Sequence, residues 1–349
     1  MKKPDFTALA RQNIRSLTAY EAKEIPCRVK LDANESPYAP VLSLDPEVMA
    51  SLNRYPDPQG LALKKALAKE LAVAERQILL GNGSDEIIYN LITAFGGPVL
   101  YPVPTFSMYG IISQSLGEQG IGIPLQGDFS LDLRKMRAAI RKLQPKLVFL
   151  SSPNNPTGNA FAREAIEEIA RVSDGLVIVD EAYQPFSKEK SFIPELNRFH
   201  NLAVLRTFSK IGLAALRLGY MLAHEAMIAE VNKVRLPYNV GALPQSLALA
   251  SLQRKQECRL AVKKIISERK RVMKELQGMP GIEPCPSDAN FILVRIPRAD
   301  SVHAALVRSG ILVRNLSGVI ADTLRVTIGT PEENAAFCAA LQQILKERS

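Results

Sequence analysis

Apolar and polar positions along the chain form two kinds of run. Short, uninterrupted apolar stretches bounded by glycine, proline or asparagine indicate buried strands, and longer stretches with apolar residues three and four apart indicate amphipathic helices. The two kinds follow one another from about residue 78 to residue 234. This alternation predicts an α/β domain in which a mostly parallel sheet is wound with helices.

The expected strands of this region begin near residues 78, 98, 120, 147, 176, 202 and 219. A long helix from about residue 244 to residue 277 then leads to a smaller lobe, with strands expected in PSDANFILVRI, GILVRNL and TLRVTIG and a closing helix over 331–346. We therefore expect three parts: an N-terminal arm over 1–33 that packs on the small domain or a partner subunit, a large domain over 34–245, and a small α/β domain over 246–349.

The composition agrees with an ordinary globular enzyme of two lobes, because 349 residues can bury a large core. The net charge of +9 raises the question of nucleic acid. The densest basic run, 254–274, carries its charges at helical spacing between apolar residues, so it is predicted to be a solvated helix face and no nucleic-acid partner is expected. A positive balance also suits anionic ligands.

Cysteine and histidine usage excludes several other classes. The four cysteines form no CxxC pair, so neither a metal site nor a disulfide framework is expected. Such usage suits a reducing cytoplasm. No run of 18 apolar residues predicts a membrane span, and the first 15 residues lack the apolar core of an export signal. The three histidines lie outside every motif, which argues against histidine-based catalysis.

One lysine stands at the centre of the candidate chemistry. In LAVLRTFSKIGLAALRLGY, residues 202–220, an apolar strand leads directly to Lys210 in a loop of small residues. Desolvation there would lower the pKa of the amine and free it for Schiff-base chemistry. Alone, this lysine is better explained as a solvated loop residue, because a single Ser-Lys pair is a weak signal.

Two upstream stretches favour a catalytic role for Lys210 over that of a solvated loop residue. LVFLSSPNNPTG, residues 147–158, is a buried strand running into an Asn-Pro turn, and LVIVDEAY, residues 176–183, is a buried strand ending in Asp180 and Tyr183. Ligands of α/β sheets gather at the carboxyl ends of the strands. Asp, Asn, Tyr and Lys at successive strand ends are the groups that pyridoxal phosphate requires.

These motifs resemble those of the fold-type I pyridoxal-phosphate aminotransferases, and most closely those of the histidinol-phosphate aminotransferases. The similarity extends from Asn13 to Gly329, nearly the whole chain. It implies an α/β fold, pyridoxal 5'-phosphate as cofactor, and transfer of the amino group of L-histidinol phosphate to 2-oxoglutarate, which gives imidazole-acetol phosphate and L-glutamate in histidine biosynthesis.

The resemblance assigns roles around the cofactor ring. Lys210 would hold the cofactor as a Schiff base, Asp180 would keep the ring nitrogen protonated, and Tyr183 and Asn155 would donate to the ring oxygen. Phe106 would stack on the ring, where the family more often has tyrosine. A structural aspartate at 180 and a core-packing phenylalanine at 106 are the competing explanations.

A phosphate is expected at the start of a helix within ILLGNGSDEIIYNLITAFG, residues 78–96. Gly83 permits close approach of the backbone, and the amides of Ser84 and Asp85 would form an anion site at the helix N-terminus. Asp85 is equally explained as a helix-capping residue.

Three further residues resemble the phosphate-binding hydroxyls and arginine of the family, namely Thr207, Ser209 and Arg217. The interval from Lys210 to Arg217 is seven residues, one fewer than the family usually shows. Gly212 would allow Arg217 to reach the phosphate despite the shorter interval. The alternative is that Arg217 only stabilises the strand that follows.

The resemblance also assigns residues to the substrate and to a second subunit. Tyr20 in NIRSLTAY would help to close the substrate pocket, with an interfacial tyrosine as the alternative, and Asn34 would lie at the substrate. Tyr55 in RYPDPQG would reach the cofactor phosphate of the neighbouring subunit, so a homodimer is expected.

Two arginines of the small lobe would hold the anionic groups of the substrate. Arg325 in TLRVTIG alternates with apolar neighbours, so its side chain emerges on the opposite face of the strand from theirs. Planar, bidentate contacts explain arginine at such a position. Arg314 in GILVRNL matches a second arginine for the substrate phosphate, with a surface salt bridge as the alternative.

Three rival functions remain open. A threonine-phosphate decarboxylase and an aromatic amino-acid aminotransferase share the fold, the lysine and the aspartate. A binding or regulatory protein that kept the fold without catalysis is disfavoured, because all four groups at the ring are present. NIRSLTAY together with Arg314 and Arg325 favours the histidinol-phosphate reaction.

Overall fold

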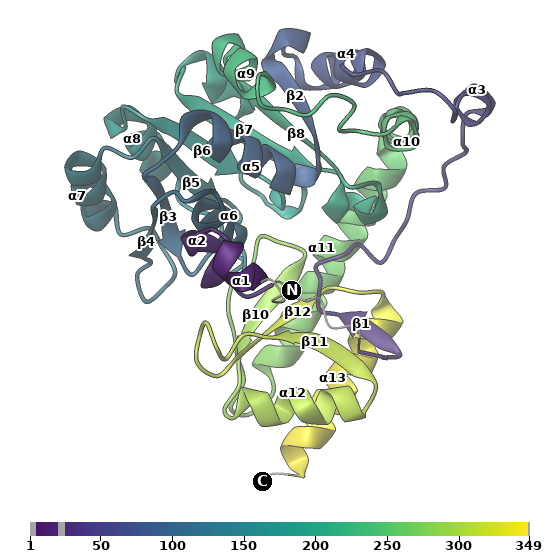
Figure 1. Cartoon of the computed structure of the whole chain (residues 1–349). Coiled ribbons are helices and arrows are strands. Elements are labelled where there is room, and N and C mark those ends of the chain that lie inside the picture. The colour runs from purple at the N-terminus through teal and green to yellow at the C-terminus, as the bar shows by residue number, and fades with distance from the viewer. Residues whose placement is uncertain (1–4, 20–24, 348–349) are drawn as a thin grey trace.

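The computed structural model describes residues 5–19 and 25–347, and it has two sheets, each covered by helices (Figure 1). The larger sheet has seven strands in the order β2-β8-β7-β6-β5-β3-β4. Only β8 runs antiparallel to its neighbours, so the sheet is mostly parallel. The strands are β2 Ile78–Asn82, β3 Val99–Val103, β4 Gly120–Pro124, β5 Leu147–Ser151, β6 Leu176–Asp180, β7 Leu202–Thr207 and β8 Leu218–Ala223. The predicted α/β class with a mostly parallel sheet is confirmed.

Helices cover both faces of this sheet, which explains why its central strands are uninterrupted apolar runs. One face packs on α4 (Leu61–Leu71), α7 (Leu133–Leu143), α8 (Arg163–Val172) and α10 (Ala242–Gln253). The other packs on α5 (Gly83–Phe95), α6 (Met108–Leu116) and α9 (Glu225–Asn232). All five residues of β5 are buried as a result.

The smaller sheet has five strands in the order β1-β11-β12-β10-β9. Its strands are β1 Val29–Leu31, β9 Glu283–Pro284, β10 Phe291–Arg295, β11 Ile311–Asn315 and β12 Thr323–Thr327. Helices α11 (Lys255–Gln277), α12 (Ala299–Arg308) and α13 (Pro331–Lys346) complete this lobe. Its core also takes in Tyr183 and Phe186, which follow β6 of the large sheet. The two lobes therefore share side chains at their junction.

The N-terminal segment contacts both lobes. Strand β1 pairs in parallel with β11 of the small sheet. Helix α2 (Gln12–Arg15), which follows the short helix α1 (Phe6–Leu9), lies instead against α6 of the large lobe (Figure 1). Asn13 Nδ2 donates to the carbonyl oxygens of Gln114 and Ser115 at 2.8 and 3.0 Å. The expected site residue Tyr20 lies outside the described residues.

One expectation for the helices was wrong. The helix expected over 244–277 is two helices, α10 and α11, which separate at Arg254. The break has a physical cause, because α10 packs in the large-lobe core whereas α11 buries Ile265 and Val272 in the small-lobe core. Phe106 lies in the loop before α6, which begins at Met108. No helix in the described ranges is long and apolar enough to cross a membrane.

Shorter elements complete the chain. Helix α3 (Pro46–Ala50) lies at the edge of the molecule beside α10 (Figure 1). The 3₁₀ turns are η1 Glu75–Gln77, η2 Gln184–Phe186, η3 Ile193–Asn197, η4 Ser209–Ile211 and η5 Ala214–Leu216. Turns η4 and η5 lie between β7 and β8, and Lys210 is at the centre of η4.

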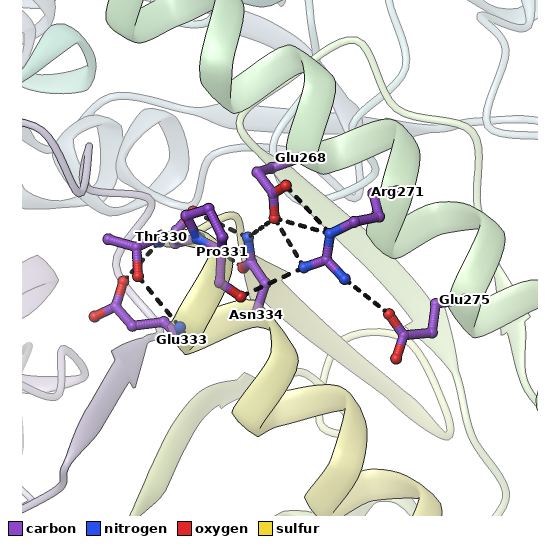
Figure 2. Close-up of polar contacts among 8 residues, drawn as sticks. Glu268, Arg271, Glu275, Thr330, Pro331, Glu333 and Asn334 are labelled. Atoms are coloured by element: carbon purple, nitrogen blue, oxygen red, sulfur yellow. Dashed lines mark hydrogen bonds and ion pairs between the residues drawn. The ribbon is translucent and has the colours of Figure 1, made fainter.

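The end of β12 is anchored by the polar junction of α11 and α13 (Figure 2). Thr330 caps α13 with a capping box to Glu333. Asn334, which is buried, accepts from the amide of Gly329 at 2.9 Å and donates to Glu268 Oε2 at 3.0 Å. Arg271 braces Glu268 from the same helix at 2.8 Å. This junction holds the strand that carries Arg325.

A buried ion pair holds the ends of β6 and β7 together. Glu181 Oε2 accepts from Arg206 Nε and Nη2 at 2.9 and 2.7 Å, and the side chain of Glu181 is only 2% exposed. Its other oxygen accepts from the amide of Phe192 at 2.6 Å. Because Glu181 follows Asp180 directly, the pair also stabilises the end of β6 that carries Asp180.

Replacing Glu181 with alanine should lower the free energy of unfolding by about 3–5 kcal/mol, because the guanidinium of Arg206 would be left buried without its carboxylate. As a control, Glu230→Ala breaks an exposed pair with Lys233 and should cost less than about 1 kcal/mol. Urea denaturation of the two variants and the parent chain measures both losses, and losses of equal size would contradict the assignment.

Candidate active site

The candidate site forms where three parallel strands end side by side. In the register of the sheet, Ser151 at the end of β5 lies beside Asp180 at the end of β6, and Asp180 lies beside Leu205 of β7. The segments that follow these strands carry Asn155, Tyr183 and Lys210. Side chains that are up to 55 residues apart in the sequence are thereby brought to one edge of the sheet.

Asp180 is the buried charge of the site. It is 3% exposed, and its Oδ2 accepts from the hydroxyl of Tyr109 at 2.8 Å while its Oδ1 accepts from the amide of Ala182 at 3.0 Å. Burial raises the pKa of this carboxyl from its ordinary 3.8 to about 6, and the two hydrogen bonds oppose that rise. A carboxylate in this setting is stabilised by a cation placed against it.

Tyr109 is a site residue that the sequence analysis missed. It lies on α6, is fully buried, and stacks on Phe149 at 4.8 Å between ring centroids. Burial and the neighbouring Asp180 raise the pKa of its hydroxyl well above the ordinary value, which keeps it protonated as a donor. Phe106 meets the same ring edge to face at 5.6 Å. The only sequence signal was a tyrosine three residues after Phe106.

Lys210 projects toward the junction of the lobes. Its Nζ donates to the carbonyl oxygen of Ala33 at 3.3 Å and lies 5.8 Å from the centre of the Tyr183 ring. Gly212 ends the turn with φ of 102°, and a Cβ atom there would lie 2.5 Å from the carbonyl oxygen of Tyr38. Only glycine therefore permits this close packing of the lysine turn on the segment 38–40.

Asn155 and Tyr183 both form hydrogen bonds with residues that belong to the small lobe or are hydrogen-bonded to it. Arg325 Nη1 donates to Asn155 Oδ1 at 2.6 Å, and its Nη2 donates to the carbonyl oxygen of Asp32 at 2.6 Å. Asn34 Nδ2 donates to the hydroxyl of Tyr183 at 3.0 Å. The site is thus assembled from both lobes, and the structure brings these four expected residues together.

A second group of expected residues forms an anion cradle at the start of α5. The hydroxyls of Thr207 and Ser209 lie 2.9 Å apart, and Arg217 Nη1 donates to Ser209 Oγ at 3.4 Å. Arg217 also pairs with Asp85 at 3.1 Å, so the short interval after Lys210 still brings the guanidinium to the helix. The backbone at Arg217 has a left-handed φ of 47° in the turn that brings its guanidinium to the helix.

The backbone of α5 reaches the cradle because two glycines allow it. Gly83 begins the helix with φ of 74°, and a Cβ atom there would lie 2.9 Å from Arg217 Nη2. On β8, a Cβ atom at Gly219 would lie 2.6 Å from the amide nitrogen of Ser84. The helix amides, two hydroxyls and a guanidinium are the donor set that binds a phosphate.

Two expected residues lie outside this cluster. Tyr55 is 81% exposed and stacks on Tyr238 at 4.6 Å. Arg314 is exposed on β11, where it is the direct cross-strand partner of Arg325. Like charges on cross-strand partners repel one another unless an anion lies between them, which makes this part of β11 and β12 a candidate anion site.

A match to the model of the aminotransferase class I and II family covers residues 26–341. The chain belongs to this family. It is therefore an aminotransferase, a class of enzyme that works with pyridoxal phosphate, and the predicted family resemblance is confirmed.

Individual proteins show which members of the family the chain resembles. The chain is 44% identical to histidinol-phosphate aminotransferase 2 of Nitrosococcus oceani, over 98% of this chain and 99% of that one. Its fold matches the histidinol-phosphate aminotransferase of Sinorhizobium meliloti in complex with pyridoxal-5'-phosphate, with a TM-score of 0.85, 23% identity and coverage of 97% and 98%. It also matches the L-threonine-O-3-phosphate decarboxylase of Porphyromonas gingivalis, with a TM-score of 0.78, 23% identity and coverage of 91% and 99%. The fold is thus shared with one of the rival activities.

The raised pKa of Asp180 predicts how the stability of the cofactor-free protein depends on pH. Because the folded chain holds this proton more tightly than the unfolded chain, the contribution is fully present below pH 3.8 and is lost as pH rises through about 6. The loss should amount to about 3 kcal/mol. Asp180→Asn should remove it.

The measurement is urea denaturation of the cofactor-free protein and of Asp180→Asn at several values between pH 4 and pH 7. The difference between the two proteins isolates Asp180 from every other titrating group. A difference that does not change across this window would contradict the assignment.

Proposed function

We propose that this protein catalyses the transfer of the amino group of L-histidinol phosphate to 2-oxoglutarate in histidine biosynthesis, with pyridoxal 5'-phosphate held on Lys210. The proposed products are imidazole-acetol phosphate and L-glutamate. The observation that carries the proposal is the placement of a buried carboxylate, Asp180, at the end of β6 and of Lys210 in the turn after the neighbouring parallel strand β7.

The described residues fit the cofactor in three places. The cradle of α5 amides, Thr207, Ser209 and Arg217 suits its phosphate. Asp180 offers a buried carboxylate to a protonated ring nitrogen. Phe106 would cover one face of the ring, as the family resemblance suggests. When bound, the cofactor supplies an aldehyde that captures the substrate amine and a ring that withdraws electrons from it.

Each protein group then has a defined task. Lys210 Nζ would take the proton from the substrate carbon that bears the amino group and deliver it to the cofactor carbon that receives that group, a transfer that contributes roughly 10²- to 10⁴-fold. Asp180 would keep the ring nitrogen positively charged. Tyr183 and Asn155 would donate hydrogen bonds to the ring oxygen, and Tyr109 holds Asp180 in place.

The anionic end of the substrate is assigned to the small lobe. Arg325 lies at the site, in contact with Asn155, and Arg314 lies beside it on the next strand. This arrangement supports a substrate with a phosphate or carboxylate remote from the amine. Asn34 and Tyr20 complete the proposed substrate pocket.

Lys210→Ala should abolish turnover and the absorbance of the bound cofactor, because no other amine replaces Lys210 at this position. The purified protein and the variant are compared by ultraviolet-visible spectroscopy after loading with pyridoxal phosphate and by glutamate formation. Lys264→Ala, which changes a lysine over the ring of Tyr38, is the control and should keep both signals. Retention of full activity by Lys210→Ala would refute the proposal.

The same preparation separates the rival activities. L-Histidinol phosphate should give glutamate in a reaction that requires 2-oxoglutarate, and L-threonine phosphate should release no carbon dioxide. Carbon dioxide release would favour the decarboxylase, and faster turnover of aromatic amino acids would favour the aromatic amino-acid aminotransferase. A colourless protein that takes up no cofactor would favour the binding or regulatory role.

A homodimer and a cytoplasmic location belong to the proposal. Exposed apolar side chains gather on and beside α3, namely Val41, Leu44, Met49, Leu52 and Tyr55, and such a patch is the kind of surface that a protein partner covers. Tyr55 would reach the phosphate cradle of the neighbouring subunit. The four cysteines are free thiols, which suits a reducing compartment.

Mixing subunits tests this arrangement. A site would use Lys210 of one chain and Tyr55 of the other, so Lys210→Ala and Tyr55→Ala should each be impaired at limiting cofactor. Refolding the two variants together should restore part of the activity, because half of the sites in mixed dimers regain both residues. Mixing without any recovery would contradict the shared site.

A further inference from the structure

Asn34 is hydrogen-bonded through both its backbone and its side chain at the junction of the lobes. It is 1% exposed and has a φ of 54°, a left-handed conformation that asparagine tolerates better than most residues. Its amide N–H donates to Thr327 Oγ1 at 2.9 Å, and its carbonyl oxygen accepts from Asn290 Nδ2 at 2.9 Å. The backbone at this residue is thereby fixed to the small sheet.

The same contacts fix which way the side-chain amide points. Because Thr327 Oγ1 already accepts from the backbone N–H of Asn34, its own proton is free to be donated to Asn34 Oδ1, which lies at 3.2 Å. The oxygen of the amide therefore faces Thr327. The Nδ2 group faces the hydroxyl of Tyr183 at 3.0 Å, where it can only donate.

A hydroxyl that accepts from Asn34 keeps its single proton for another acceptor. Tyr183 is buried, its ring packs edge to face on Phe291 at 5.1 Å, and Lys210 Nζ lies 5.8 Å from the ring centre. The ring position is thus set by the small lobe, and the hydroxyl proton is left for an acceptor other than Asn34.

We propose that Asn34 is a positioning residue that directs the proton of Tyr183 toward the ring oxygen of the cofactor. The inference rests on the proposed function, and it extends the role of Asn34 beyond the substrate contact that the family resemblance suggests. A hydrogen bond donated to the ring oxygen would stabilise its negative charge, which would be largest when Lys210 Nζ, bonded to the cofactor, carries no proton. Asn34 therefore lowers the pH midpoint at which the absorbance of the bound cofactor changes.

The test is a spectrophotometric pH titration of the cofactor-loaded protein and three single variants. Tyr183→Phe should raise the midpoint by roughly one unit, the size expected for one lost hydrogen bond. Asn34→Gly accepts the left-handed φ and adds no charge, and it should raise the midpoint by part of that amount. Asn34→Asp presents an acceptor to Tyr183, which reverses the hydrogen bond and should raise the midpoint at least as far as Tyr183→Phe.

Double variants distinguish direction of the proton from charge or packing. In the Tyr183→Phe background, Asn34→Gly should cause no further shift, and Asn34→Asp should cause only the smaller shift due to its charge. Equal shifts in the presence and absence of the Tyr183 hydroxyl would overturn the inference. Unchanged midpoints in both single Asn34 variants would also overturn it.

Two controls keep the inference separate from the proposed function and from folding. If the parent protein shows no cofactor absorbance, the proposed function fails and the inference fails with it; if the parent and Tyr183→Phe titrate as expected but the Asn34 variants do not differ from the parent, only the inference fails. Thermal unfolding of each cofactor-free variant reports folding, and titration midpoints are compared between proteins whose melting temperatures match. If Asn34→Asp is unstable, Asn34→Gly as the second variant retains the test.

Discussion

The site depends on a carboxylate that is buried at the end of a parallel strand. Asp180 is surrounded by apolar strands and is held by one phenol and one amide, so its negative charge is costly until a cation lies against it. The same energy would be available to bind a positively charged ring. In the proposed function, burial at Asp180 is therefore a source of cofactor affinity, and the fold provides it by covering both faces of the sheet.

Around this charge, the protein divides its tasks between the lobes. The large lobe supplies the groups that we propose for the ring nitrogen and the phosphate, namely Asp180 and the cradle at the start of α5. The small lobe supplies the contacts that hold Asn155 and Tyr183, through Arg325 and Asn34. Binding of an anionic substrate near Arg325 would thus act on residues that touch the cofactor.

The fold and much of the site could be predicted from the sequence, because buried parallel strands are apolar runs that end in polar residues. LVFLS and LVIVD identified β5 and β6, and parallel pairing then required their ends to meet. Tyr109 was missed because only the packing of α6 on the sheet turns its hydroxyl toward Asp180. The separation of α10 and α11 was missed because the helical pattern continues through Arg254, and the break depends on two different cores.

The side chain of Tyr183 belongs by sequence to the end of β6 and by packing to the core of the small lobe. Any opening of the molecule must therefore bend the chain between Asp180, which stays with the sheet, and Tyr183, which travels with the other lobe. That bend would lie between the two residues proposed to contact the same ring, Asp180 at its nitrogen and Tyr183 at its oxygen. Opening would move Asp180 and Tyr183 apart, so release of the ring and separation of the lobes would occur together.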